Sequence, residues 1–423
     1  MRPTLSDAIA VPNAPAPAPQ SLNPFKTLLR HRNFRLFWIG QTTSLIGTWM
    51  QSMAQGWLAL ELSNSAFLVG LVASVGSLPI LVLSLHAGEM VDRTDKLKLV
   101  RIGQAAFGLQ AVALWWFTWS HHITIGWLLT LATINGIINA IEIPARQSLV
   151  IELVGRDDLP AAIALNSSGF NLARIVGPSI GAIIIARLGL AWCFGVNAIS
   201  YVAVLAGLMM VRLPPWVPRE QFASVFEGIQ QGVRYMRDTR SVSSLMRLVT
   251  VYSVLGVPYL TLMPVVARDR LGLDAGGYGA LLSCVGIGGL VGALSLAAIA
   301  DRVRRGLLLL WSSMGYGLLL IVFALVTRPI AAYPILLGLG FFMIVNSALA
   351  NSMLQHLVPN ELRGRLMAAY SFVVVGLSSV LGSFIGGTVA HAIGVAWAIG
   401  GGGAIMVAYT IRAFSPQSPL RHV

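Results

Sequence analysis

The sequence predicts an all-α membrane protein with twelve transmembrane helices. Of its 423 residues, 56% are hydrophobic and only 11% are charged, whereas an ordinary soluble domain is roughly one-quarter charged. Apolar runs of roughly 20 residues, enough to cross the hydrocarbon core, recur along the whole chain. They are too long, and too free of turn residues, to be strands of a membrane barrel, so their backbone must be helical.

The expected helices fall into two groups of six, joined by a polar segment. They cover residues 35–60, 66–88, 99–119, 123–150, 161–186, 190–211, 244–267, 277–299, 306–326, 330–355, 365–390 and 395–413. We therefore assign six-helix bundles to 31–212 and 244–414, with a cytoplasmic linker and amphipathic helix at 213–243. The Pro/Ala-rich start, 1–30, lacks a signal-peptide core and is expected to be a disordered tail; 415–423 forms a second tail.

The positions of the basic residues predict the orientation. The formal net charge is +13, which in a soluble protein would suggest nucleic acid. With the N-terminus inside, however, nearly all Lys and Arg fall in inner segments, and the outer loops hold only Arg187, Arg268, Arg270 and Arg328. This positive-inside pattern places both termini in the cytoplasm. It makes the lipid bilayer, and not nucleic acid, the expected partner.

The sequence offers no group that would hold a cofactor or a metal. Cys193 and Cys284 fall in expected helices, so we expect free thiols. Cys and His residues lack metal-ligand spacing, and the chain has no G-x-x-x-x-G-K-[ST] loop for ATP. No set of His, Cys, Asp and Glu converges either, which argues against an intramembrane enzyme.

Short motifs recur in the two groups of helices. GEMVDRTDK, with Asp92 and Arg93, ends the second helix, and AAIADRVRR, with Asp301 and Arg302, ends the eighth. GPSIGA in the fifth helix matches GSFIGG in the eleventh. Two bundles related by duplication are typical of secondary transporters, which bind cargo at the interface between the repeats.

These motifs resemble those of the major facilitator superfamily, over about residues 30–413. Three stretches, RNFRLFWIGQTTSLIGTWMQ, EIPARQSLV and LPAAIALNSSGFNLARIVGP, resemble the bacterial enterobactin-exporter-like group, also described as transmembrane secretion effectors. The resemblance implies the major facilitator fold of two pseudo-symmetric six-helix bundles, acting as a monomer in a bacterial inner membrane.

The resemblance also assigns roles to the motifs. The gating motif comprises Gly88, Asp92, Arg93, Lys96, Asp301 and Arg302. Asp92 would dock on the positive N-terminus of the helix that starts near Leu362 when the cytoplasmic side closes; alternatively, it only fixes topology. Gly177, Pro178 and Gly181 of the fifth helix resemble a motif associated with antiporters, although the next position is Ala182 where the pattern prefers glycine. Together with Gly382 and Gly386 of the eleventh helix, they would let helices approach closely.

Polar residues at helical spacing predict a cavity. They are Gln41, Ser44, Thr48, Gln51 and Gln55 on the first helix, Asn135, Asn139, Glu142 and Arg146 on the fourth, and Asn171 and Arg174 on the fifth. Each set shares one helix face, and a face turned to lipid would not collect such residues. In the second half, Tyr252, Tyr259, Asn346 and Asn351 would form an aromatic and amide lining. The alternative for each set is bonding or packing between helices.

The charged residues of the first half allow three roles. Glu142 and Arg146 lie one turn apart, and Arg174 is the third charge. Glu142 could form a static ion pair with Arg174, or it could carry protons, since burial favours its neutral form while the arginines favour the charged form. In the third role, Arg146 or Arg174 attracts an anionic or catecholate-like cargo.

Together these features predict a secondary transporter. We expect it to export small amphiphilic molecules, siderophore-like or drug-like, by alternating access in exchange for protons. A small-solute importer and a non-transporting sensor or scaffold of the same fold are the alternatives. Polar stripes in both halves argue against the scaffold, because it would not need to keep them.

Overall fold

The computed structural model describes residues 24–214, 234–299 and 303–415, and within these ranges every regular element is helical. The first half contains α1 (Pro24–Arg30), α2 (Arg32–Ser63), α3 (Ala66–Asp92), α4 (Lys96–Trp119), α5 (Ile125–Val154), α6 (Leu159–Leu188) and α7 (Ala191–Met209). The second half contains α9 (Arg240–Val251), η1 (Tyr252–Gly256), η2 (Val257–Tyr259), α10 (Met263–Val265), η3 (Val266–Arg270), α11 (Ala275–Ile299), α12 (Arg305–Leu325), α13 (Pro329–Leu357), α14 (Asn360–Ser371), η4 (Phe372–Gly382), α15 (Ser383–Ile393) and α16 (Val395–Ala413).

Short capped turns join consecutive helices of the first half. Ser65, Asp95 and Thr124 each accept a hydrogen bond from the backbone N–H three residues later, which satisfies a free donor at the start of α3, α4 and α5. Asn64 ends α2 with φ 48°, a left-handed conformation that asparagine adopts more readily than most residues. Because these turns contain only a few residues, each helix packs antiparallel to the one before it.

Two rods of the second half depart from regular α-helix. The segment from α9 to η3 forms one membrane span, Arg240–Arg270, in which Pro258 and Pro264 remove backbone donors. The rod from α14 to α15 contains the π-helical η4. Wider π turns are frequent near functional sites, and both irregular rods flank the contact between the halves.

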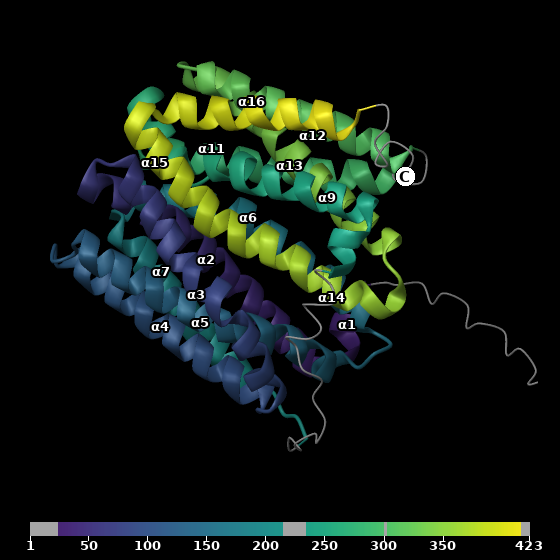
Figure 1. Ribbon diagram of the computed structural model, residues 1–423. Helices are drawn as coiled ribbons and strands as arrows, with labels where there is room; N and C mark the ends of the chain where they lie inside the picture. The colour runs from purple at the N-terminus through teal and green to yellow at the C-terminus, as the bar shows by residue number, and fades with distance from the viewer. Residues whose placement is uncertain (1–23, 215–233, 300–302, 416–423) are drawn as a thin grey trace, which may run out of the picture.

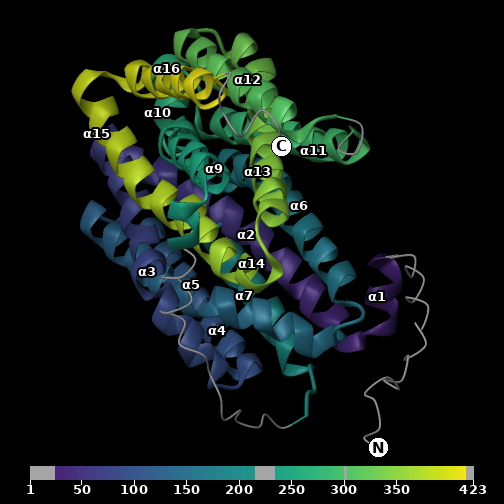
Figure 2. The same ribbon diagram turned by 45° about the vertical axis from the view of Figure 1, so that its right-hand side comes forward.

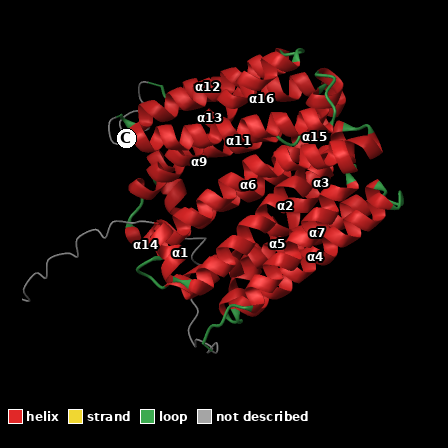
Figure 3. Cartoon of the chain, turned by 180° about the vertical axis from the view of Figure 1, so that it is seen from behind, coloured by secondary structure: helices red, strands yellow, loops and turns green. Residues whose placement is uncertain are grey.

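The two bundles lie side by side, with the α14–η4–α15 rod running along their contact (Figures 1 and 2). This rod packs on α3, and on the other side of the molecule α6 packs on α11 (Figure 3). Glycines allow the close approach: a Cβ on Gly387 would lie 3.0 Å from the Cα of Gly70, and one on Gly279 would lie 2.8 Å from the carbonyl oxygen of Pro178. The halves therefore meet backbone to backbone along two seams.

The structure confirms the all-α fold and gives each expected span a helical counterpart. Among the described residues, 11 helices are long and apolar enough to cross a membrane. The remaining span, α2, has 32 residues and is long enough, but its polar stripe makes it less apolar. Two boundaries change: α1 occupies the end of the expected tail at 1–30, and α9 begins at Arg240, inside the expected linker at 213–243. Most of the expected amphipathic linker helix lies outside the described residues, although residues 234–238 are helical.

The topology can be checked with single cysteines on either side of α5. His122 and Arg156 are exposed before and after this helix. In a background that lacks Cys193 and Cys284, we expect a membrane-impermeant thiol reagent to label His122→Cys from outside and Arg156→Cys only after the membrane is opened. Labelling of both from one side would contradict the helix count.

Candidate functional site

A cavity of about 400 Å³ lies between the two halves. It is lined by α2, α3 and α5 of the first half, and by α11 and the segment between η2 and α10 of the second half. Ligand pockets commonly have volumes of about 300–1,000 Å³. The cavity is therefore large enough for a small organic molecule, and its wall belongs to both repeats.

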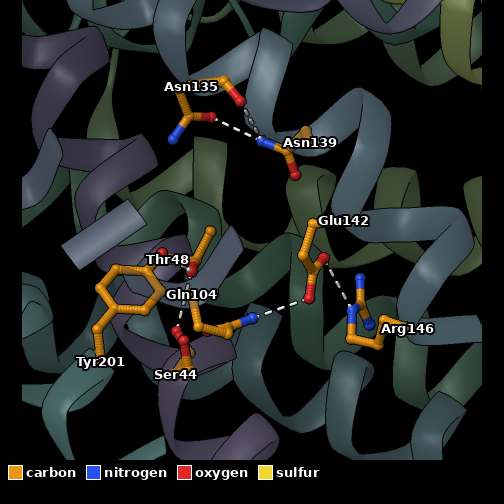
Figure 4. Close-up of polar contacts among 8 residues, drawn as sticks. All are labelled: Ser44, Thr48, Gln104, Asn135, Asn139, Glu142, Arg146 and Tyr201. Carbon is orange, nitrogen blue, oxygen red and sulfur yellow. Dashed lines mark hydrogen bonds and ion pairs between the residues drawn. The ribbon is translucent and has the colours of Figure 1, made fainter. Parts of the chain in front are cut away.

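The lining combines apolar surface with a few hydrogen-bonding groups. Its polar side chains are Ser52, Gln55, Ser77, Asn135, Asn139, Thr261 and Tyr278. Asn135 and Asn139 lie one turn apart on α5, and Asn139 Nδ2 donates to Asn135 Oδ1 at 2.8 Å (Figure 4). Amides both donate and accept hydrogen bonds, so this wall suits hydroxyl and carbonyl groups of a ligand.

Contacts join the halves beside the cavity and at the helix ends that the charge pattern assigns to the outside. The ring of Trp57 stacks on that of Tyr278, with centroids 5.8 Å apart. Arg268 Nη1 donates to Asn64 Oδ1 at 2.8 Å and to the carbonyl oxygen of Leu60 at 3.4 Å. Arg268 belongs to the second half and its two acceptors to the first. Arg268, one of the four arginines that the charge pattern assigns to outer loops, thus joins the two halves.

At each of the two seams, a serine hydroxyl forms a hydrogen bond that joins one half to the other. Ser74 Oγ donates to the carbonyl oxygen of Val380 at 2.9 Å, and Ser179 Oγ lies 2.7 Å from Ser283 Oγ. Both contacts, like those of Trp57 and Arg268, lie level with the cavity or nearer the outer helix ends. These bonds are individually weak, about 1 kcal/mol or less, which suits a contact that must open.

The polar face of α2 that the sequence predicted, Gln41 to Gln55, forms most of its hydrogen bonds within the first half. Gln51 Nε2 donates to Gln110 Oε1 at 3.0 Å, and Asn197 Nδ2 donates to Gln51 Oε1 at 2.8 Å. Gln110 Nε2 in turn donates to the carbonyl oxygen of Leu131 at 3.2 Å. This chain of amides ties α7, α2, α4 and α5 together and satisfies groups that would be costly to bury alone.

The other residues on this face of α2 mostly do not line the cavity, contrary to the expectation from the sequence. Thr48 Oγ1 lies 3.1 Å from the hydroxyl oxygen of Tyr201 (Figure 4), and Gln41 and Ser44 are buried. Of the five expected residues on α2, only Gln55 lines the cavity. The other four face the interior of their own bundle, because α2 is surrounded by protein on more than its cavity side.

Glu142 is buried between α5 and α4, with 2% of its surface exposed. Its Oε1 accepts from Gln104 Nε2 at 2.8 Å and its Oε2 from Arg146 Nε at 3.1 Å (Figure 4). Gly103 makes room for it, since a Cβ there would lie 2.9 Å from Glu142 Cγ. Both oxygens act as acceptors, and neither residue of the pair lines the cavity.

Arg174 does not pair with Glu142, which corrects the expected apposition. Its guanidinium points across the seam, where a Cβ on Gly289 of α11 would lie 2.5 Å from Nη2. The helices α5 and α6 are neighbours, but the two side chains leave them in different directions. Asn171, one turn before Arg174, donates to the carbonyl oxygen of Ser167 at 2.9 Å and does not line the cavity.

The expected residues of the second half are packed within it. Tyr252 and Tyr259 are buried beside Tyr316, with ring centroids 5.0 and 6.3 Å from it. Asn346 donates to a serine hydroxyl of α12 at 2.5 Å, and Asn351 accepts from a glutamine one turn later at 2.7 Å. None of these four lines the cavity. The second half instead contributes Leu260, Thr261, Tyr278 and Leu282.

The expected gating motif lies at the C-terminal end of α3. Asp92 is exposed at the last residue of the helix. Arg93 Nη2 donates to Glu89 Oε1 at 2.6 Å, while Lys96 Nζ lies 3.5 Å from a carboxylate oxygen at the end of α5. Docking of Asp92 on α14 stays a prediction, and Asp301 and Arg302 lie outside the described residues.

The two glycine motifs occupy equivalent places in the two halves. A Cβ on Gly177 would lie 2.7 Å from the Cβ of Trp49, and one on Gly382 would lie 2.9 Å from the carbonyl oxygen of Val254. The first pair joins α6 to α2, and the second joins η4 to η1, which is the matching pair of spans. The motifs therefore allow close packing within each bundle.

Several residues that shape the site were not among those expected from the sequence. They are Gln104, Gln110, Asn197 and Tyr201 inside the first half, and Trp57 and Tyr278 at the contact between the halves. For Gln104, Gln110 and Asn197, a single amide within an apolar run of the sequence could have indicated a buried hydrogen-bonding residue. No group of His, Cys, Asp and Glu in the described part of the chain could hold a metal ion.

Comparisons of fold define the class of protein. The chain is similar to the nucleoside transporter NupG, with TM-score 0.70 and 12% identity over 91% of this chain and 100% of that one. It is similar to a D-xylose-proton symporter, with TM-score 0.69 and 15% identity over 91% and 99%. A bacterial homologue of the lysosomal transporter Spinster, in an inward-facing and unoccupied conformation, gives TM-score 0.68 and 13% identity over 93% and 95%. The fold is that of a major facilitator transporter.

Sequence comparison defines the family. The model of the transmembrane secretion effector family matches residues 22–421, so the chain belongs to that family. It is a membrane transporter and not an enzyme. Among curated relatives, it is similar to the enterobactin exporter EntS of Shigella flexneri, with 23% identity over 361 residues, 85% of this chain and 86% of the relative. The exporter EntS of Escherichia coli O1:K1 / APEC is 24% identical over 364 residues, with the same coverage.

The Glu142–Arg146 pair generates a stability prediction. Removing one partner of a buried ion pair costs about 3–5 kcal/mol, but Arg146 keeps 24% of its side chain exposed, so we expect Glu142→Gln to cost about 1–3 kcal/mol. Glu142→Gln combined with Arg146→Gln should recover part of this loss. Thermal unfolding of the purified protein measures both.

The matched control is Glu152→Gln. Glu152 lies at a longer distance, 3.5 Å, from Lys96 Nζ and is 37% exposed, so its loss should cost under about 1 kcal/mol. Wild-type stability in Glu142→Gln, together with intact cargo binding and a lost response to a pH gradient, would instead assign proton transfer to Glu142.

Proposed function

We propose that this transporter exports small amphiphilic molecules, siderophore-like or drug-like, across the bacterial inner membrane by alternating access in exchange for protons. It acts as a monomer with both termini in the cytoplasm. The observation that carries the proposal is the cavity lined by both halves, with the Trp57–Tyr278 and Arg268–Asn64 contacts joining the halves toward the helix ends that the charge pattern assigns to the outside. A cargo in the cytoplasm would reach such a cavity, and separation of the outer contacts would release it outside.

The lining supports the cargo class. Trp49 and Tyr278 offer aromatic surface, Met53 and Leu282 offer apolar surface, and the amides of α5 offer hydrogen bonds. A sugar or amino acid would call for a denser set of polar groups, whereas an amphiphile matches both kinds of wall. The relatives named as enterobactin exporters support both a siderophore-like cargo and the outward direction.

The remaining parts of the proposal have separate support. The excess of Lys and Arg on one side supports cytoplasmic termini. Exchange for protons is supported by the glycine motif of α6, which resembles one associated with antiporters. In the state described, Glu142 is held by two donors, so we propose that its main role is to neutralise Arg146.

Transport into everted membrane vesicles tests direction and coupling together. We expect a catecholate siderophore, or a lipophilic fluorescent dye, to accumulate in everted vesicles with an acidic interior, and a protonophore to abolish this. Accumulation only in right-side-out vesicles would identify an importer. Accumulation that ignores the imposed gradient would remove proton exchange from the account.

The cavity itself generates a matched pair of variants. Asn139→Leu removes an amide from the lining and fills space there, so we expect cargo transport to fall by about tenfold or more, since one lost hydrogen bond to a ligand is worth roughly 1 kcal/mol and filling adds to it. Asn171→Leu makes the same chemical change outside the lining and should leave transport within about twofold. Equal effects at equal expression would show that this cavity does not hold the cargo.

A further inference from the structure

Arg174 carries a charge at the middle of the contact between the halves. It lies 15 residues into the 30-residue helix α6, which places it near the centre of the membrane. Its guanidinium reaches Gly289, near the middle of α11. That glycine is also close to Ile344 of α13, 2.9 Å from an added Cβ. Arg174 is thus anchored in one half and presents its charge to the other.

Two of the three guanidinium nitrogens lack a partner among the described residues. Nε and Nη2 are both buried and have no hydrogen bond, and so is the hydroxyl of Tyr259. The hydroxyl groups of Tyr259 and Tyr252, from the second half, lie near Arg174. Tyr252 already donates to a backbone carbonyl at 3.0 Å, but Tyr259 remains free to act with Arg174.

No carboxylate whose side chain the structure describes forms an ion pair with Arg174. Glu142 is held by Gln104 and Arg146. The acidic residues of the second half whose side chains are described, Asp238, Asp269 and Asp274, lie at or beyond helix ends. An isolated arginine at the membrane centre costs about 2.5–3.5 kcal/mol even by the lower scales, and buried unbonded N–H groups add to that cost. A charge that served packing alone would have a built-in partner.

The position of Arg174 relates it to the cavity. Gly289 follows the cavity residue Leu282 by seven residues on α11, which is two turns or about 10 Å toward the inner end. The Arg174 side chain keeps part of its surface accessible. In the proposed orientation, Arg174 therefore lies between the cavity and the cytoplasm, on the side from which cargo enters.

We propose that Arg174, together with Tyr259, binds an anionic oxygen of the cargo, a carboxylate or a catecholate, at the contact between the halves. This rests on the proposed function and narrows its cargo to amphiphiles that carry an acidic group. The planar guanidinium would donate two parallel hydrogen bonds to the anion, and the Tyr259 hydroxyl would donate a third. The bound anion would supply the negative charge that balances Arg174. Because Arg174 and Tyr259 belong to different halves, the same ligand would link the two halves.

Binding of two probes that differ in charge alone tests the proposal. The purified protein in lipid nanodiscs is titrated with 2-naphthoate and with its neutral amide, 2-naphthamide. We expect wild type to prefer the carboxylate, and Arg174→Gln to weaken naphthoate by about tenfold or more, as for loss of a charge-assisted hydrogen bond. Naphthamide binding should change by less than about twofold. The affinity of Arg174→Lys for naphthoate should lie between those of wild type and Arg174→Gln. Lysine keeps the positive charge but lacks the planar guanidinium that donates two parallel hydrogen bonds.

Two further variants keep the test decisive. Tyr259→Phe should weaken naphthoate by about threefold to tenfold, and it stands in for Arg174→Gln should that variant fold poorly. Arg187→Gln removes an exposed arginine from the outer end of the same helix and should have no effect. Equal binding of both probes to wild type, no binding of either, or equal loss in Arg187→Gln would overturn the proposal.

Competition between chloride and naphthoate distinguishes an organic anion of the cargo from an inorganic anion at Arg174. Chloride titrated from low to physiological concentration should compete weakly with naphthoate. If chloride alone binds at Arg174 and excludes naphthoate, the site holds an inorganic anion and the cargo proposal fails. Failure here is distinct from failure of export, because vesicle transport of a neutral lipophilic dye should persist in Arg174→Gln.

Discussion

The structure depends on one constraint: inside a membrane, a polar group must find its partner within the protein or its cargo. In the first half this constraint produces the amide chain from Asn197 through Gln51 to Gln110, and the carboxylate of Glu142 between two donors. Each joins neighbouring helices into a rigid bundle. Several buried polar atoms of the described residues lack a partner, and Arg174 is the charged residue among them, with two such nitrogens. An unpartnered charge costs more than an unpartnered neutral group, so Arg174 is the group for which a partner outside the chain matters most.

Rigid bundles and a weak seam between them fit the motion that the fold requires. Within each half, buried networks and glycine contacts such as Gly177 on α2 hold helices together. Between the halves, the bonds are single serine contacts, a stacked Trp57–Tyr278 pair and the Arg268 bridge. The outer contacts can separate without disturbing either core. Alternating access then needs only that the two bundles rock about the cavity they share.

Most of the fold could be predicted from the sequence, but much less of the site. Span length, charge asymmetry and the repeated Asp-Arg and glycine motifs predicted the helices and the two halves, because membrane thickness leaves few alternatives. Helical spacing identified the polar face of α2 but not its direction, since a cavity and a bundle interior both attract polar residues. Gln51 therefore bonds inside the bundle, while Gln55 one turn later lines the cavity. The pairing of Arg174 depended on side-chain direction across the seam, which spacing does not encode.

The central claim is that the two halves move as units about a shared cavity, and distances between spin labels measure this most directly. One label pair joins Leu62 to Arg328 at the outer ends, and a second joins Arg156 to Arg304 at the inner ends; all four residues are exposed. Without cargo, the outer pair should show a single short distance. Cargo and an imposed proton gradient should lengthen the outer distance and shorten the inner one together. Distances that stay fixed, or that change in the same direction, would contradict the account.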